Sequence, residues 1–523
     1  MNGYLKSEKG IKSAQNNFLL SNSNSWLFYI VLAVVTIIYV TTFRSGHYWV
    51  GDDLQYIRHA MNLVEGKPYI DPLYINNSIA TVSPSAYPPI FPIILSIIYI
   101  LFGLNFVAMK VVLVGFFISS IILLKKILES HTSNMTIISV AILLSINPEF
   151  WQFKDRILTE FPFLFFALLT LLLMQLNDIK QSYTYALLLG ITMYLSYGIR
   201  EIALVLPLTL ITYELWHYQK ITIRSLMAIS FFIILAAAHQ FLFEVTPVHF
   251  EFKHQLDLLI GSEAAAPTTF SYINIDPENI IKQGEKYFWS IYRILQIKHL
   301  PFSGHIYLFI NVLVLTGFLT ALFKKVRVTE IYFSGYLCAL LLFAGFDGFR
   351  YLVPIFPFYL YYLIIGFQKL ISLTPSLVKY VVPIMIITVA FVNFMGHFNK
   401  GTNQLKLDIR STKIDQLHAY VSGHTQKNDI LVSINPRVLS FFTQRSASAY
   451  PFSLNDPQWF MNYLQAINAH YLITEIDPNT KSLHKKKEID LLFKLYPDTF
   501  SQVFDNGDFQ VYLIKKSHMI SLR

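Results

Sequence analysis

The stretch "WLFYIVLAVVTIIYVTTFRSGHYWVGDD", residues 26–53, joins an apolar run to two adjacent carboxylates, Asp52 and Asp53. The run from Trp26 to Phe43 is long enough to span a bilayer, which requires about 20 predominantly apolar residues. It has no small-x-small cleavage site, so we expect a membrane anchor rather than a removed signal peptide. The polar segment 1–25 carries three lysines, and we predict that it stays in the cytoplasm.

The composition of the whole chain is that of a polytopic membrane protein. Of its 523 residues, 54% are hydrophobic and 14% are charged, whereas a soluble domain averages about 25% charged residues. The net charge of +9 is spread over short basic clusters between apolar runs, as in cytoplasmic loops, so it does not indicate a nucleic-acid partner. Cys338 is the single cysteine, which excludes an intrachain disulfide.

The number of membrane spans depends on one short run, residues 88–102, which begins with two prolines. The other apolar runs lie at 105–124, 134–151, 157–175, 183–198, 201–216, 225–245, 305–323, 330–346, 350–368 and 379–397. If residues 88–102 do not cross, basic clusters such as Lys125-Lys126 and Lys324-Lys325 all fall on the cytoplasmic side, as the positive-inside rule requires. We therefore predict about eleven spans, or about 12–13 if shorter runs also cross.

This topology divides the chain into a transmembrane domain, 26–397, and a tail, 398–523. The long loops 44–87 and 246–304 both fall on the exoplasmic side. In the tail, strand-like runs ("DILVSI", "HYLITEI", "FQVYLIK") alternate with helical ones ("VLSFF", "QWFMNYLQAI"). We predict a small α/β domain on the exoplasmic or periplasmic side of the plasma (inner) membrane.

The two carboxylates after the first span have two interpretations. Residues 53–65 show helical periodicity, with Leu54, Ile57 and Met61 on the apolar face, and predict an amphipathic helix lying on the membrane surface. Asp52 is then a preferred N-cap, and Asp53 favours the helix dipole in the first turn. Capping alone would explain both residues, and chemistry at the exoplasmic mouth would also explain them.

The order of several short motifs points to a known family. The motifs are Asp52-Asp53, Glu65-Gly66, Tyr87-Pro88-Pro89, Phe102-Gly103, the acid-containing loop from Arg156 to Glu160, and "RYLVPIFP" from Arg350 to Pro357. Together they resemble the GT-C superfamily of membrane glycosyltransferases, and in particular glycosyltransferase family 39, the protein O-mannosyltransferases and aminoarabinose transferases. The likeness covers most of the chain before the tail. Position 53 departs from it, because the protein mannosyltransferases usually have Glu there.

The resemblance implies transfer of a sugar from a polyprenyl phosphate to a protein, lipid or glycan acceptor on the exoplasmic face. Asp52 would be the catalytic acid-base residue, and Asp53 and Tyr87 would contribute to substrate binding. A transporter or a lipid or glycan flippase is the alternative, although such folds are built from repeats that we do not find. A non-catalytic scaffold would leave the Asp52-Asp53 pair unexplained.

Cationic side chains are expected beside the leaving phosphate, whose charge develops in the transition state. Candidates at exoplasmic ends of the predicted spans or at the foot of the long loop are Arg156, Arg200, Lys298, His299 and Arg350, with Tyr351 beside the last. Each cation alone could equally extend along the membrane interface toward water.

Glu160 is an acidic residue at membrane depth, where such residues are costly and usually functional. It could orient a sugar hydroxyl, hold a divalent cation with Asp52, or pair with Arg156 one helical turn away; no cofactor is certain. In the long loop, Asp276 and Pro277 predict the start of a second interfacial helix with an apolar stripe. That helix could be a lid over the site or a passive surface helix.

Overall fold

The computed structural model describes residues 25–44, 46–47, 51–75, 86–180, 182–243, 276–342, 348–372, 411–450, 457–475 and 483–515, with a few positions between 388 and 396. These residues fall into two compact units. The helical unit takes its residues from 1–44, 107–241 and 268–403, and the sheet unit from 45–106, 242–267 and 404–523. Segment 1–24, most of the run 379–397 and residues 246–275 lie outside the described part of the chain.

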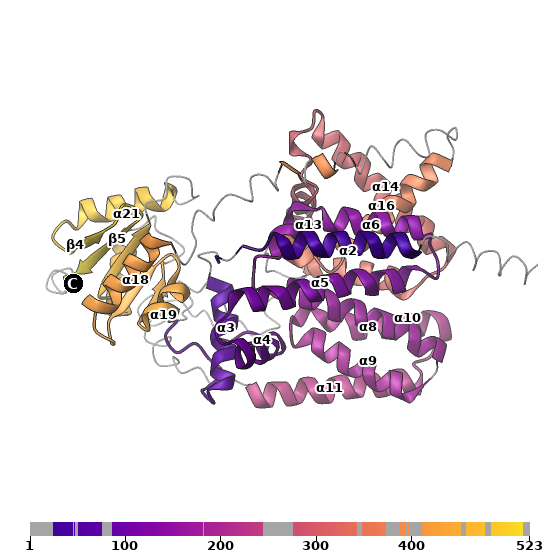
Figure 1. Ribbon diagram of the computed structural model, residues 1–523, viewed down its shortest axis with the longest axis horizontal. Coiled ribbons are helices and arrows are strands. Elements are labelled where there is room, and N and C mark those ends of the chain that lie inside the picture. The colour runs from indigo at the N-terminus through magenta and orange to yellow at the C-terminus, as the bar shows by residue number, and fades with distance from the viewer. Residues whose placement is uncertain are drawn as a thin grey trace, which may run out of the picture. The chain divides into compact units, whose positions relative to one another are not determined.

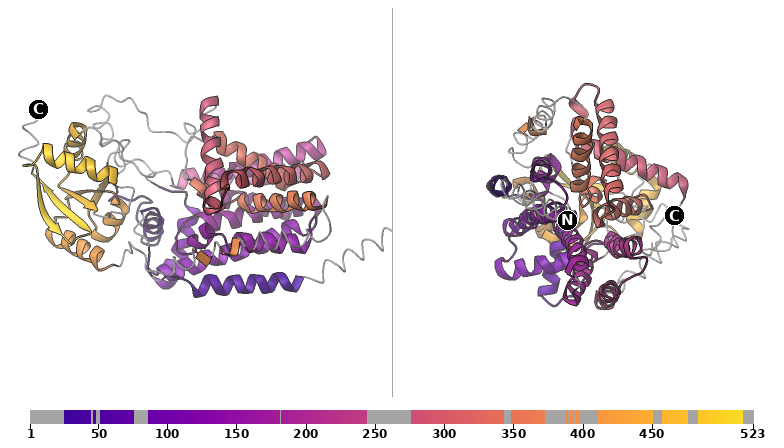
Figure 2. Two further views of the ribbon diagram at one scale, coloured as in Figure 1. Left: turned by 90° about the horizontal axis from the view of Figure 1, so that it is seen from above. Right: turned by 90° about the vertical axis from the view of Figure 1, so that its right-hand side faces the viewer.

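The helical unit is a bundle whose long helices run side by side (Figure 2). Its elements are α2 (Ser25–Thr41), α5 (Phe106–Leu128), α6 (Asn134–Ser145), α7 (Pro148–Phe153), α8 (Glu160–Lys180), α9 (Tyr183–Tyr197), η1 (Glu201–Leu204), α10 (Val205–Tyr218), α11 (Ile223–Phe243), α13 (Pro277–Ile294), η3 (Ile297–His299), α14 (Ser303–Lys324), α15 (Val328–Leu342), η4 (Gly348–Leu352) and α16 (Phe356–Ser372). Each apolar run predicted from 105 to 368 therefore contains a helix, which confirms the helical character of these runs.

Four of the described helices, α5, α8, α11 and α14, are long and apolar enough to cross a membrane by length and composition. The outer surface of the bundle has the same character. On α14, for example, Leu308, Val312 and Leu315 are each more than half exposed, and their spacing puts them on one helix face. Water-soluble proteins rarely expose apolar stripes of this kind, so the surface is suited to lipid.

The tightest helix contact in this unit is made by two glycines. A Cβ built on Gly317 of α14 would lie 1.9 Å from the carbonyl oxygen of Tyr362 in α16, and one on Gly366 would lie 1.9 Å from the carbonyl oxygen of Leu313. Each glycine therefore admits the backbone of the other helix. Small residues allow close helix approach in membrane bundles, where dispersion rather than water exclusion drives packing.

Contacts between loops show that the basic residues gather at one end of the bundle. His217 at the end of α10 bonds to the carbonyl of Val326 at 2.9 Å, which joins the α10 end to the α14–α15 loop. Arg327 and Lys324 from that loop act electrostatically on His131, in the α5–α6 loop. The C-terminal end of α5, with Lys125 and Lys126, and that of α14, with Lys324 and Lys325, thus lie at the same end of the bundle.

The sheet unit begins with α3 (Gly51–Val64) and α4 (Ile90–Phe102), which pack against each other. Its C-terminal part, drawn in orange to yellow in Figure 1, contains α18 (Thr412–His424), β1 (Ile430–Ser433), α19 (Pro436–Thr443), β2 (Ser446–Ala449), α20 (Pro457–Ala466), β3 (Tyr471–Glu475), α21 (Leu483–Leu495), β4 (Phe500–Asp505) and β5 (Phe509–Ile514). The strand order is β2-β1-β3-β5-β4, with β2, β1 and β3 parallel and the last two pairings antiparallel. The predicted strands β1, β3 and β5 and the helices α19 and α20 are confirmed.

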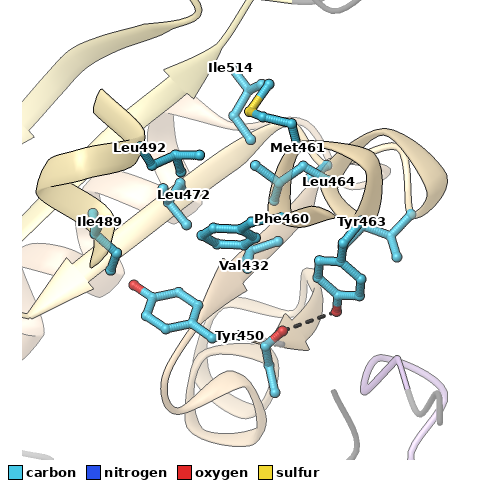
Figure 3. Close-up of a cluster of buried hydrophobic side chains, with 13 residues drawn as sticks. Val432, Tyr450, Phe460, Met461, Tyr463, Leu464, Leu472, Ile489, Leu492 and Ile514 are labelled. Atoms are coloured by element: carbon cyan, nitrogen blue, oxygen red, sulfur yellow. Dashed lines mark hydrogen bonds between the residues drawn. The ribbon is translucent and has the colours of Figure 1, made fainter. Parts of the chain in front are cut away.

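The connections of the parallel strands place helices on both faces of the sheet. From β1, α19 leads to β2 on one side, and α20 leads back across β1 to β3, so right-handed crossovers put the two helices on opposite faces. Figure 3 shows the core under α20 and α21, where Phe460, Leu464 and Leu492 surround Val432. In it Tyr463 donates a 3.0 Å hydrogen bond to the carbonyl of Ala449.

The helix α3 differs from its prediction in two respects. It begins at Gly51, so Asp52 lies inside the first turn, and the N-cap assignment is wrong. Its predicted polar face is not in water, because Gln55, His59 and Asn62 are all buried. The cover comes from α19, which packs against α3, and from a loop whose carbonyls of Pro68 and Ile70 accept hydrogen bonds from Asn62.

Candidate functional site

Within the sheet unit, Asp52 forms an ion pair that the sequence did not predict. Arg437 Nη1, from the first turn of α19, donates a 2.6 Å hydrogen bond to Asp52 Oδ1. Tyr87, predicted as a substrate-binding residue, donates its hydroxyl to the same oxygen at 3.3 Å. The Asp52 side chain is 24% exposed and that of Arg437 4% exposed, so solvent reaches the carboxylate and not the guanidinium.

The second carboxylate of the pair has a different environment. Asp53 is fully buried, and its Oδ2 lies 3.0 Å from Nε2 of His47, which precedes α3 and stacks on Phe106. A buried carboxylate beside an imidazole ties the start of the helix to the segment before it. Solvent can therefore reach the carboxylate of Asp52, whereas that of Asp53 is enclosed by the protein and paired with His47.

The aromatic residues behind α3 are also held by polar contacts. The backbone N–H of Tyr87 donates to His59 Nε2 at 3.4 Å, and the rings of Tyr87 and Tyr56 stack at 4.3 Å. Burial, with the nearby charges of Arg437 and Arg58, lowers the pKa of His59 to about 3. The imidazole is therefore neutral at physiological pH and acts as an acceptor in this contact.

Within the helical unit, four of the predicted site residues come together. Glu160, at the first position of α8, is buried, and its Oε1 accepts hydrogen bonds from Arg200 Nη2 at 2.7 Å and from Arg350 Nε. Arg200 also donates to the hydroxyl of Thr159 at 2.8 Å, and its guanidinium carbon lies 5.4 Å from the centre of the Tyr351 ring. We call Glu160, Arg200 and Arg350 the arginine–glutamate trio.

Glu160 is the shared acceptor of the trio. Both arginines use the same oxygen, and Glu160 Oε2 is buried without a hydrogen-bond partner among the described residues. Two guanidinium groups side by side in a site of low dielectric are suited to bind an anion. An oxyanion such as phosphate has the geometry that arginine side chains recognise.

The premise for one of the three alternatives at Glu160, its pairing with Arg156, is wrong. It assumed one continuous helix, but α7 ends at Phe153 and α8 begins at Glu160, so the two residues are not one helical turn apart. Arg156 lies half-buried in the intervening turn. Helix ends rather than helix faces therefore build the trio, from the start of α8, the joint between α9 and η1, and η4.

Two buried lysines of the helical unit, Lys110 and Lys154, bind backbone carbonyls. Lys154 is fully buried and donates 2.6 Å hydrogen bonds to Asp155 Oδ2 and to the carbonyl of Thr42. Lys110 donates to the carbonyl of Arg44 at 3.1 Å. These lysines bind carbonyls that follow α2, where the last carbonyls of a helix need partners, so they tie the helical unit together.

The remaining predicted residues lie apart from these contacts. Lys298 is exposed on η3, and the side chain of His299 lies outside the described part of the chain. The helix α13 begins as predicted, with Asp276 accepting from the N–H of Glu278. Ile281 on its apolar stripe is 73% exposed, and the opposite face packs against α15 and η4, which carries Arg350. Among the described residues, no group of three or more His, Cys, Asp or Glu side chains could hold a metal ion.

Arg437 is the residue that sequence reasoning missed. It lies 385 positions from Asp52, in a domain whose pattern indicated only a fold. One weak signal was present: a basic residue in the first turn of a helix opposes the helix dipole, and "NPRV" places Arg437 there. Such a residue is expected to have a specific anionic partner.

The structure matches solved proteins, although the sequence does not: no family model and no curated protein matches it. The archaeal oligosaccharyltransferase AglB from Archaeoglobus fulgidus, in complex with an inhibitory peptide and a dolichol-phosphate, matches with a TM-score of 0.58 at 11% identity, over 95% of this chain and 75% of its own. ArnT from Cupriavidus metallidurans, bound to undecaprenyl phosphate, gives 0.51 at 11% identity, over 94% and 98% of the two chains. The arabinofuranosyltransferase AftD from Mycobacteria gives 0.51 at 12% identity, over 94% and 42%. All three are GT-C glycosyltransferases, and the chain has the GT-C fold.

Proposed function

We propose that this chain is an integral membrane glycosyltransferase that moves a sugar from a polyprenyl-phosphate donor to an acceptor on the exoplasmic face. The observation that carries the proposal is the fold, which the chain shares with two proteins solved with a polyprenyl-type phosphate, AglB and ArnT. The partly exposed carboxylate of Asp52 and the guanidinium groups of the trio are the two kinds of group that such a transfer needs.

In the proposed reaction, the acceptor hydroxyl attacks the anomeric carbon of the donor sugar. The bond from that carbon to the phosphate oxygen breaks, and the lipid phosphate leaves with both electrons. Asp52 accepts the hydroxyl proton as general base, for which a carboxylate open to the reacting group is required. Its exposed side chain and its two hydrogen bonds at Oδ1 support this role.

The trio is proposed to bind the donor phosphate. Arg200 and Arg350 would contact the phosphate, while Glu160 holds both guanidinium groups in place and neutralises one charge. Tyr351, against Arg200, would hold the plane of that guanidinium. Arg156, Lys298 and His299 stay candidates for weaker contacts, and Asp53 and Tyr87 for support of the base.

The proposed topology keeps about eleven spans, with the N-terminus in the cytoplasm and the tail on the exoplasmic side. The basic loops gather at one end of the helical bundle, as the positive-inside rule requires of cytoplasmic loops. The helix α4 has 13 residues, about 20 Å at 1.5 Å per residue, which is shorter than the hydrocarbon core of about 30 Å. This length supports a run 88–102 that does not cross.

The test is sugar transfer by the purified protein in nanodiscs, using radiolabelled polyprenyl-phosphate hexoses and pentoses with protein, lipid and glycan acceptors. Asp52→Asn should lower kcat by about 10²–10⁴, the usual cost of losing a general base. Asn keeps an oxygen that can accept from Arg437, but it removes the counter-ion, so thermal unfolding must show that the variant is folded.

Asp71→Asn is the matched control, because Asp71 is a buried carboxyl group of the same unit that bonds the N–H of Leu73. It should retain transfer. Near-normal transfer by a folded Asp52→Asn variant would remove Asp52 from the mechanism. Movement of an intact lipid-linked sugar across the bilayer, with no donor consumed, would instead identify a flippase.

A further inference from the structure

The proposed reaction leaves Arg437 without a role, although it makes the shortest contact of Asp52 among the described residues. Its guanidinium and the Tyr87 hydroxyl both bind Oδ1, which fixes the direction of the carboxylate at one atom. The ring of Tyr74 lies 5.5 Å from the guanidinium carbon. The arginine is therefore enclosed, while the carboxylate that it holds is open to solvent.

The Gly-Asp-Asp triplet makes this contact possible. A Cβ on Gly51 would lie 3.2 Å from Cβ and 3.3 Å from Nε of Arg437. Both distances are tighter than ordinary van der Waals contact, so a side chain at position 51 would require the arginine to shift by a few tenths of an ångström. The triplet thus provides a carboxylate and the space for its cation.

The segments that carry the two partners are fixed to each other. The helix α19, with Arg437 in its first turn, packs against α3. The chain after α3 extends the edge of the C-terminal sheet, where Ile75 N–H bonds to the carbonyl of Ala447 at 2.9 Å and Ala447 N–H to that of Leu73 at 2.8 Å. Arg437 and Asp52 are thus presented by one rigid framework.

We propose that Arg437 is the positioning residue of Asp52: it aims the carboxylate at the acceptor hydroxyl and keeps it ionised until the acceptor arrives. The inference rests on the proposed function and adds that the C-terminal domain is a working part of the catalytic centre. Arg437 exchanges no proton, because a guanidinium stays protonated in proteins. The acceptor proton passes to Asp52 and from there to water.

If Arg437 keeps Asp52 ionised, kcat should depend on pH through Asp52, and few other groups nearby could give kcat a similar dependence. The helix α4, packed on α3, carries no charged side chain, and α19 carries only Arg437. Among the described residues, the other titratable or charged groups near this end of α3 are His47, Asp53, Tyr56, Arg58, His59, Asp71, Tyr74 and Tyr87. His59 titrates near pH 3, and burial raises the pKa of Asp71, which Asp71→Asn tests separately.

The experiment compares Arg437→Gln and Arg437→Lys with Arg445→Gln over a range of pH. Arg445 is the matched control: it is also buried in the C-terminal domain, but it bonds the carbonyls of Ser422, Thr425 and Thr443 instead of a carboxylate. Arg437→Gln should lower kcat by about 10–100-fold, the usual loss for a residue that orients a functional ligand, with KM for the lipid donor unchanged. The acid limb of its kcat–pH profile, where kcat falls at low pH, should move to higher pH, because the fixed charge that favours ionised Asp52 is gone.

Arg437→Lys keeps the charge but not the planar fork, so its acid limb should stay in place while kcat falls. Arg445→Gln and Asp71→Asn should leave the acid limb where it is in the wild type, even if they lower the unfolding temperature. In an Asp52→Asn background, Arg437→Gln should have no further effect on transfer.

The outcomes separate this inference from the proposed function. If Asp52→Asn abolishes transfer while folded Arg437→Gln keeps the wild-type kcat and acid limb, the positioning role is refuted and the transferase stands. The same holds if Arg445→Gln moves the acid limb as far as Arg437→Gln does, because the effect would then be a general one of domain stability. If the wild-type chain transfers no sugar from any donor, the proposed function itself fails.

Discussion

Glu160→Gln tests the arginine–glutamate trio by removing its negative charge while keeping the shape of the side chain. The Glu160 side chain is 1% exposed, and those of Arg200 and Arg350 are 11% and 16% exposed. Removing one partner of a buried ion pair costs about 3–5 kcal/mol. At roughly 2 °C per kcal/mol for a unit of this size, the unfolding temperature should fall by about 5–10 °C.

The same variant tests the binding of phosphate. In Glu160→Gln a neutral amide replaces the carboxylate that both arginines share. A short-chain polyprenyl phosphate should therefore raise the unfolding temperature of the variant more than that of the wild type, because both arginines keep their charge and the stabilisation by a ligand grows with the logarithm of its affinity for the folded state. Both quantities can be measured by differential scanning fluorimetry in detergent.

Glu201→Gln is the matched control, because Glu201 is an exposed carboxylate directly after Arg200. This variant should unfold at the wild-type temperature, and polyprenyl phosphate should raise that temperature by as much as in the wild type. A Glu160→Gln variant that unfolds at the wild-type temperature would show that the trio is not a buried ion pair. Equal stabilisation of variant and wild type by polyprenyl phosphate would show that these arginines do not bind the phosphate.

Three further predictions concern stability. Gly317→Ala should destabilise by about 1–3 kcal/mol, because its Cβ would lie 1.9 Å from the Tyr362 carbonyl oxygen, whereas Gly304→Ala in the same helix has open space and should not destabilise; equal unfolding temperatures would contradict the close contact. Burial lowers the pKa of His59 to about 3 from 6.5, so its contribution to stability is complete above pH 6.5 and is lost as the pH falls toward 3, with a slope of at most about 1.4 kcal/mol per pH unit. His59→Gln should flatten the fall in unfolding temperature between pH 7 and pH 4, and an unchanged slope would show that His59 is not its source. Tyr463→Phe removes the hydroxyl bonded to the Ala449 carbonyl and should cost about 1–3 kcal/mol in denaturant unfolding, so an unchanged midpoint would contradict that bond.

The helices of the transmembrane part could be predicted from the sequence because each must be apolar over its length, whatever its neighbours are. The strands β1, β3 and β5 followed from runs of branched and aromatic residues in the same local way. The strand β2, "SASA" at residues 446–449, has no such residues. Its pairing with β1 gives it a strand conformation that its own composition does not favour.

The site was predicted less completely because its contacts join distant segments. One alternative paired Glu160 with the nearest arginine along a helix, but the helix begins at Glu160 and the arginines that bond it lie 40 and 190 positions away. The polar face of α3 was expected to lie in water because its cover, α19, belongs to the tail. Residue type marked Asp52, Glu160, Arg200 and Arg350 as candidates, and only the tertiary structure could supply their partners.

The distance along the chain between Asp52 and Arg437 also sets an order of events during synthesis. At about 5–20 residues per second, the 385 positions between them take roughly 20–80 s to translate. Throughout that interval Gln55, His59 and Asn62 lack the helix α19 that covers them, and Asp52 lacks its cation. A nascent chain can therefore form the helices that precede α19 before Asp52 meets Arg437, so the contact between α3 and the C-terminal domain forms late in synthesis.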